Sequence, residues 1–231
     1  MENFSLQMQE YIGRLAANPR IELCYRESDY NAQPASWLAR LAAFFEEEYG
    51  FAIPPDDWGL FSLDEIIHVI WTHKPGLELP GGYDYFDGSI DLNAIGATVR
   101  DPGNKLQMSA YDPLKEYARY FDMASPLDTG IPTMLLYDEA ARAYKGLAVF
   151  LRPEIVPIEL TPGEYVRKAL AWHGARNWQL LYCSLEDFKR LDMVDRRQVY
   201  DLPRLLPFLF PDDDWSIIDT RRAYFDTEHD A

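Results

Sequence analysis

Histidines and carboxylates are the side chains in this sequence that could hold a metal ion or transfer a proton. The chain has four histidines and 38 acidic residues. His68 and His73 are five residues apart on an expected helix, about 140° around its axis, so one ion is poorly reached by both. No HExxH motif and no Cys/His cluster occurs. His173 is expected to cap a helix C-terminus and to complement the helix dipole. The histidine spacing therefore predicts no metal site.

The segment from Tyr83 to Asp91 superficially resembles a calcium loop. An EF-hand needs oxygen ligands at alternating positions ahead of its glycine. Alignment on Gly88 places Tyr83 and Tyr85 at the first and third ligand positions. The pattern fails, and an exposed turn is expected instead.

Motifs for phosphate binding and for nucleophilic catalysis are also absent. Neither GxxxxGK[ST], GxGxxG nor GxSxG occurs in the sequence. No pair of acids is marked as the acid and base of a glycosidase. Four tryptophans could stack a ligand, but at helix and strand positions they are more typical of a core: Trp71, Trp172, Trp178 and Trp215. We predict no catalytic constellation and no cofactor.

Charge is the strongest compositional signal. The 231 residues carry 38 acidic and 22 basic side chains, a net charge of −16. This balance argues against nucleic acid as a ligand, because a phosphate backbone requires Lys and Arg. Residues 36–100 hold eleven Asp and Glu against three Arg and Lys, a net −8 and half of the total.

A concentrated negative field would steer a basic protein partner into contact. The alternative is a solvated acidic surface that only aids solubility. Glu46, Glu47 and Glu48 lie in the last turn of an expected helix, the unfavourable end for negative charge, which hints at a use. The predicted partner-binding residues are acidic and aromatic side chains of residues 36–100: Glu46, Glu47, Glu48, Asp56, Asp57, Trp58, Tyr83, Asp84, Tyr85, Asp87 and Asp91.

Residues 1–129 read as helices with short strands. Apolar spacing predicts helices over residues 4–17 and 36–49, the second capped by Ser36 and ended by Gly50. Ser62 to Glu65 has the pattern of a capping box, which predicts a helix through about Trp71. Asp112-Pro113 predicts another helix, with apolar residues through Phe121. Short strands are expected near residues 21–26 and 90–95.

The segment from Gly130 to Gly174 gives the clearest structural signal. Two apolar runs, residues 133–137 and 146–151, predict a hairpin, and a third short run surrounds Val156. Thr161-Pro162-Gly163-Glu164 then predicts a capped helix. Residues 178–183 resemble a final strand, and Ser184 caps a last helix through Val194.

These elements favour an α+β fold: one domain with a mostly antiparallel sheet flanked by helices, and with helical extensions at both ends. No apolar run approaches the roughly 20 residues of a membrane helix. The N-terminus lacks the pattern of a signal peptide. Cys24 and Cys183 form no CxxC motif and are expected to be buried, which favours a reducing cytoplasm.

Taken in order, several segments resemble the SUKH superfamily of immunity and regulatory proteins. The matching segments are FFEEEYGFAIPPDDW, GLFSLDEII, IPTMLLYDEAARAYKGLAVFL and ELTPGEYVRKALAWHG. The resemblance covers residues 36–183. It divides the chain into an N-terminal extension (1–35), a SUKH-like core (36–183) and a C-terminal helix with an acidic tail packing on the core (184–231).

The resemblance implies an α+β fold without enzymatic activity. Many bacterial members of the superfamily neutralise a cognate toxin, often a nuclease. An acidic surface can occupy the basic cleft of such a toxin, which agrees with the charge argument. Two alternatives stay open: a scaffold or regulatory module of the same fold, and a hydrolase or transferase with a carboxylate site.

Overall fold

The computed structural model describes residues 4–27, 34–63, 66–106, 113–123, 130–151 and 153–226. Seven strands form one sheet in which every strand pairs antiparallel with its neighbours in sequence order. The strands are β1 (Ile21–Glu27), β2 (Ile66–His73), β3 (Asp87–Asn93), β4 (Ala118–Asp122), β5 (Thr133–Asp138), β6 (Ala143–Leu151) and β7 (Glu154–Ile158). The fold is a single α+β domain, as predicted.

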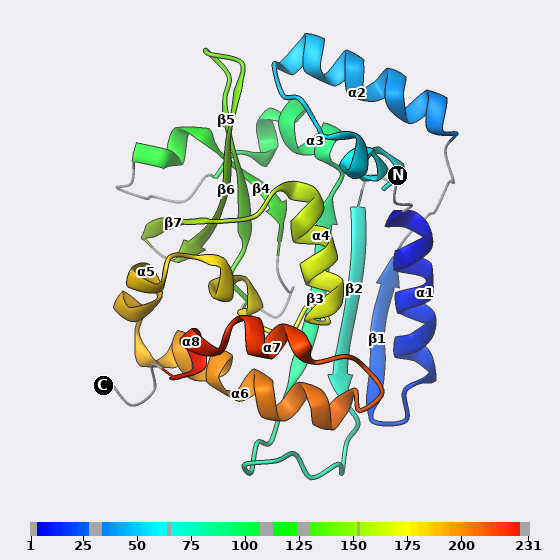
Figure 1. Ribbon diagram of the computed structural model, residues 1–231, viewed down its shortest axis with the longest axis vertical. Helices are drawn as coiled ribbons and strands as arrows, with labels where there is room; N and C mark the ends of the chain where they lie inside the picture. The colour runs from blue at the N-terminus through cyan, green and yellow to red at the C-terminus, as the bar shows by residue number, and fades with distance from the viewer. Residues whose placement is uncertain are drawn as a thin grey trace.

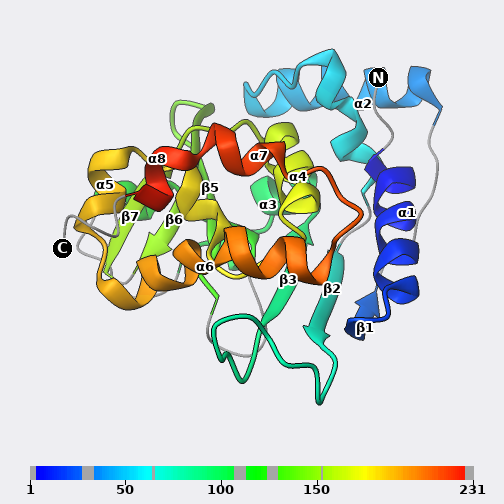
Figure 2. The ribbon, with the colours of Figure 1, turned by 60° about the horizontal axis from the view of Figure 1, so that its bottom comes forward.

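Helices flank this sheet (Figure 1). The α-helices are α1 (Phe4–Ala17), α2 (Ala35–Tyr49), α3 (Ile95–Arg100), α4 (Pro162–Ala171), α5 (Leu185–Arg190), α6 (Met193–Leu209), α7 (Ser216–Thr220) and α8 (Arg222–Phe225). The 3-10 helices are η1 (Pro55–Ser62), η2 (Pro102–Asn104), η3 (Pro113–Tyr117) and η4 (Trp178–Tyr182). Figure 2 shows α4 to α8 on one face of the sheet, with α1 beside β1 and α2 at one end.

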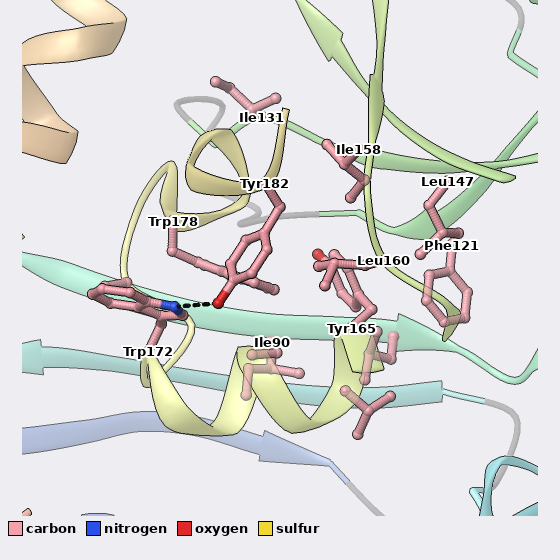
Figure 3. Close-up of a cluster of buried hydrophobic side chains, with 14 of the residues drawn as sticks. Ile90, Phe121, Ile131, Leu147, Ile158, Leu160, Tyr165, Trp172, Trp178 and Tyr182 are labelled. Carbon is pink, nitrogen blue, oxygen red and sulfur yellow. Dashed lines mark hydrogen bonds between the residues drawn. The ribbon is translucent and has the colours of Figure 1, made fainter. Parts of the chain in front are cut away.

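The main core lies between the sheet and the layer of helices. Trp71, Trp172 and Trp178 are buried there, which confirms the expectation that they are core residues. Within this cluster, Trp172 donates to the hydroxyl of Tyr182 at 3.1 Å, as the dashed line in Figure 3 marks. Tyr165 of α4 also lies within the cluster.

A second, smaller core lies against β4 to β7. Met134 and Leu136 belong to this cluster, whereas Leu135 and Tyr137 belong to the main core. Side chains alternate between the two faces of a strand, so β5 is apolar along its length because both of its faces are buried.

Several local predictions are confirmed. α1, β1, β5, β6, β7 and α4 form where the sequence predicted them. Thr161 and Glu164 make both hydrogen bonds of the capping box. Gly50 ends α2 with φ of 62°, a left-handed conformation that favours glycine. Ser184 caps α5, although that helix ends at Arg190 and not at Val194.

Three helix or strand predictions are wrong. Residues 66–71 form most of β2, because this β-branched and aromatic run pairs with β1 and β3 on both sides. Asp64 and Glu65 of the supposed capping box lie outside the described residues. Ala118 to Phe121 belong to β4, since only the short helix η3 precedes them. Residues 178–182 form a 3-10 helix, with one bridge from Cys183 to Ile158.

Smaller corrections concern caps and cysteines. Pro34, not Ser36, occupies the N-cap of α2, without a side-chain hydrogen bond. Cys183 is buried as expected, but Cys24 is exposed, and both are free thiols.

The chain termini contribute to the same sheet and core as the middle. β1 is an edge strand of the sheet, and Phe4 and Met8 of α1 are buried in the main core. Leu202 and Leu206 of α6 are buried there as well. The proposed domain boundaries at residues 35 and 183 stay a prediction. No helix within the described ranges is both long and apolar enough to cross a bilayer.

Candidate functional site

The predicted partner-binding residues do not form one surface. Glu46, Glu47 and Glu48 lie at the C-terminus of α2, at the top of Figure 1. Tyr83, Asp84 and Tyr85 lie in the β2–β3 loop (residues 74–86), at the bottom of both Figures 1 and 2. We call these two regions the α2 end and the loop end.

The α2 end exposes large apolar side chains beside the glutamates. Of the 15 residues of α2, the buried ones are Leu38, Ala42 and Phe45. Trp37 and Phe44 keep 38% and 54% of their surface exposed. With a rotation of about 100° per residue, Trp37, Phe44 and Glu48 lie on one face of the helix, roughly 100° around the axis from the buried residues. The three glutamates are all exposed.

Arg142, in the turn between β5 and β6, holds the C-terminus of α2. Its guanidinium donates to the backbone carbonyl oxygens of Glu47 and Glu48. A Cβ added to Gly50 would collide with the carbonyl oxygen of Arg142, so the glycine is also needed for this close approach. A cation at a helix C-terminus stabilises the helix dipole. The positive charge of Arg142 thus offsets the unfavourable position of the glutamates at the helix C-terminus. The sequence did not reveal this contact, because Arg142 is more than 90 residues away from the glutamates.

Asp57 points into the protein and is only 4% exposed. Its Oδ1 accepts from Arg167 Nη1 at 3.0 Å, and its Oδ2 accepts from Thr161 Oγ1 at 3.4 Å. The carboxylate also lies against Gly163 in the first turn of α4, where negative charge is favourable. Asp57 therefore anchors η1 to α4 and is removed from the free acidic surface.

The two residues that flank Asp57 in the sequence differ in exposure. Asp56 is exposed. Trp58 is half-buried, and its Nε1 donates to the carbonyl oxygen of Ile53 at 2.9 Å. Asp56 is therefore accessible to a partner, whereas Trp58 serves mainly to hold η1.

At the loop end, the predicted residues surround a small cavity of about 140 Å³. The loop contributes Tyr83, Tyr85, Phe86 and Asp87 to its lining. Tyr85 is 49% exposed, and Asp84 is also exposed. Burial and the neighbouring carboxylate of Asp87 raise the pKa of Tyr85, so its hydroxyl stays protonated near neutrality.

Four lining residues of this cavity come from distant parts of the sequence: Arg176, Gln198, Asp201 and Leu205. Sequence reasoning missed all four. Arg176 Nη2 donates to Asp87 Oδ2 at 2.6 Å, and Asp87 is only 4% exposed. No local motif could have revealed this pairing, because Arg176 lies 89 residues after Asp87 and approaches it only through the tertiary fold.

Asp91, the last of the predicted residues, lies within the sheet. It is half-buried on β3, opposite His68 of β2. Burial raises the pKa of Asp91, and the charge of nearby His68 offsets part of this rise. Asp91 therefore belongs to neither end.

The two histidines of β2, His68 and His73, are not placed to share a metal ion. His68 and His73 are on a strand and not on a helix, and their odd spacing directs them to opposite faces. Across the described parts of the chain, no three His, Cys, Asp or Glu side chains are grouped so as to hold an ion.

His173 makes a buried pair with Asp213, in the turn after α6. Its Nε2 is 2.6 Å from Asp213 Oδ2, and its ring stacks on Phe210 with 3.7 Å between ring centres. Burial lowers the pKa of His173, and this effect outweighs the opposing attraction of Asp213. The neutral ring therefore does not act as the expected cationic partner of the α4 dipole. It joins the end of α4 to the turn after α6, beside a cavity of about 350 Å³.

Comparison of this chain with protein-family models, with curated proteins and with solved structures finds no match.

Proposed function

We propose that this chain is a non-enzymatic binding protein, an immunity protein of the SUKH type that neutralises a basic protein toxin by occluding its surface. The docking surface in this proposal is the α2 end: the exposed face of α2 together with Glu46, Glu47, Glu48 and Asp56. A cytoplasmic site of action belongs to the same proposal.

The exposed aromatic face of α2 is the observation that carries the proposal. Trp37 and Phe44 together present a large apolar surface to solvent, beside the buried face of the helix. Contiguous apolar patches on soluble proteins commonly mark interaction sites. Tryptophan is also among the residues that contribute most to binding energy at protein interfaces.

The charge of the chain supports a basic partner. Glu48 shares the exposed face with Trp37 and Phe44. Glu46 and Glu47 are exposed in the same last turn of α2, and the whole chain carries a net charge of −16. Acidic groups at the rim of an interface act mainly on the association rate and on the choice of partner. An apolar centre with an acidic rim therefore suits a protein with a basic cleft, such as a nuclease toxin.

The experiment is a protection assay. The product of the reading frame beside this gene is expressed inducibly in bacteria, with and without this chain, and survival is counted. We expect the wild-type chain to protect and to form a complex whose association slows as salt rises.

Two variants test whether the α2 end or the loop end is the docking surface. W37A/F44A combined with E46K/E47K/E48K should abolish protection, with the dissociation constant raised at least roughly hundredfold. D84K/Y85A, a matched change at the loop end, should leave protection intact. Full protection by the α2 variant would refute the α2 end as the docking surface. Absence of both toxicity and complex formation would favour the scaffold alternative, and substrate turnover by the chain itself would favour the enzyme alternative.

A further inference from the structure

The cavity at the loop end has the size of a site for one side chain. We call it the tyrosine pocket. Its volume of about 140 Å³ lies well below the roughly 300–1,000 Å³ of pockets that hold a drug-sized ligand. A cofactor would not fit into this space, whereas a single planar polar group on an aliphatic stem would.

Three aromatic side chains line the tyrosine pocket. Tyr83 is half-buried, Tyr85 is 49% exposed and Phe86 is buried. The face of an aromatic ring attracts a cation. Arg204 of α6 already lies over the ring of Tyr83, with its guanidinium carbon 5.6 Å from the ring centre. This contact is an example of a guanidinium packed on a tyrosine ring at this site. The ring of Tyr85 is about half exposed and is therefore accessible to a second guanidinium.

The polar lining favours a hydrogen-bond donor. Gln198 Oε1 is buried and has no hydrogen-bond partner among the described residues. An unsatisfied buried acceptor is costly, and a ligand that donates to it would recover that cost. A guanidinium has five N–H donors and no acceptor, which matches this requirement.

Both carboxylates that line the tyrosine pocket already hold a guanidinium. Asp87 Oδ2 accepts from Arg176 Nη2 at 2.6 Å, and Asp201 Oδ1 accepts from Arg204 Nη2 at 2.7 Å. Asp84 adds an exposed acid in the loop, and the whole chain carries a net charge of −16. The chemistry of this lining therefore suits guanidinium groups, and the surrounding charge attracts a cation and not an anion.

We infer that the tyrosine pocket binds a guanidinium group, stacked on Tyr85 and donating to Gln198. The inference is independent of the proposed function, because the α2 end and the loop end lie at opposite ends of the molecule (Figure 1). The guanidinium could belong to an arginine side chain of a partner protein or to a free arginine-like molecule, and the two sources share the same chemistry.

The test is a titration of the full chain with N-acetyl-L-arginine amide and with its neutral counterpart N-acetyl-L-citrulline amide, followed by calorimetry. We expect the arginine derivative to bind roughly tenfold more tightly than the citrulline derivative. Free L-arginine is the third ligand. Tighter binding of the blocked derivative supports a partner's side chain as the source, and tighter binding of free arginine supports a small molecule.

Three variants complete the test. Y85A and Q198L should each weaken the arginine derivative about tenfold, through loss of the stacking surface and of the acceptor. Y25A is the matched control, since Tyr25 is 44% exposed on β1 and lies outside the pocket lining. Circular dichroism reports the folding of each variant. Equal binding of the arginine and citrulline derivatives, no binding of either, or unchanged affinity in Y85A would overturn the inference.

Discussion

The α2 end and the loop end carry similar acidic and aromatic residues, but they hold them differently. At the α2 end, Glu46 to Glu48 are exposed, and the aromatic face of α2 is open to solvent. At the loop end, Asp87 is buried against Arg176, and Tyr83 is covered by Arg204. The first arrangement leaves its groups available to a large partner, whereas the second forms a small cavity with internal ion pairs.

The difference shows why acidic residues cannot be counted as one patch. When a buried carboxylate is paired with an arginine, removing one partner destabilises the fold, because the other charge is left uncompensated. An exposed carboxylate contributes little to stability and remains free to attract a partner. The following predictions test this division, from the largest effect to the smallest.

The two adjacent phenylalanines of α2 should respond very differently to truncation. Phe45 is 3% exposed and packs against Phe51 and Phe61, so F45A should lower the free energy of unfolding by roughly 3–5 kcal/mol. F44A, at a side chain that is 54% exposed, should change it by less than about 0.5 kcal/mol. Urea unfolding measures both. Equal losses would contradict the assignment of the two helix faces.

The adjacent acids of η1 provide the second contrast. D57N removes the charge that pairs with Arg167 and should cost about 1–3 kcal/mol of stability. D56N should be neutral within about 0.5 kcal/mol, because Asp56 is exposed. Thermal unfolding at one pH compares the variants. If D57N had no effect on stability, the assignment of Asp57 as a buried anchor between η1 and α4 would be wrong.

Arg142 should contribute to the stability of the α2 end. R142A removes the donor to the last carbonyl oxygens of α2 and should cost about 0.3–1 kcal/mol. R40A, at an exposed position within the same helix, serves as the control and should show no loss. Chemical unfolding in low salt detects the difference, which should shrink as salt rises. A loss of the same size in R40A would show that the effect is not specific to the helix C-terminus.

The smallest expected effect is a change in pH dependence at His173. Because burial lowers the folded-state pKa of His173, the neutral ring stabilises the fold above the unfolded pKa of about 6.5, and this contribution is lost as pH falls below it. Asp213, whose pKa is lowered by its bond to His173, stays charged over this range. H173N keeps a residue that tolerates the positive φ of 55° but does not titrate.

Unfolding free energies at pH 7.5 and pH 5.5 measure this effect. H173N should be less stable than the wild type at pH 7.5 but should lose less stability on acidification. His68 and His73 are present in both proteins and cancel in the comparison. Equal losses between the two pH values would show that His173 does not contribute to acid sensitivity.

Sequence patterns predicted correctly those elements whose conformation depends on residues close together in the chain. The capping box at Thr161, the left-handed Gly50 and the hairpin of β5 and β6 all depend on neighbours within a few residues. The apolar residues of β2 fit either a helical or a strand period, and only pairing with β1 and β3 decides between them. Residues 118–121 and 178–182 are equally ambiguous in sequence: pairing with β5 makes the first a strand, and the second is a 3-10 helix.

The sequence by itself determined the α+β class, the capped helix α4, the buried tryptophans and the strong negative charge, because composition and short-range pattern govern these properties. The tertiary structure alone decided which acids are free and which are paired. Arg167 reaches Asp57, and Arg176 reaches Asp87, across about 90 to 110 residues of sequence. Such pairs form only where packing of the helical layer brings distant side chains within hydrogen-bond distance, and no local rule of charge or spacing encodes that approach.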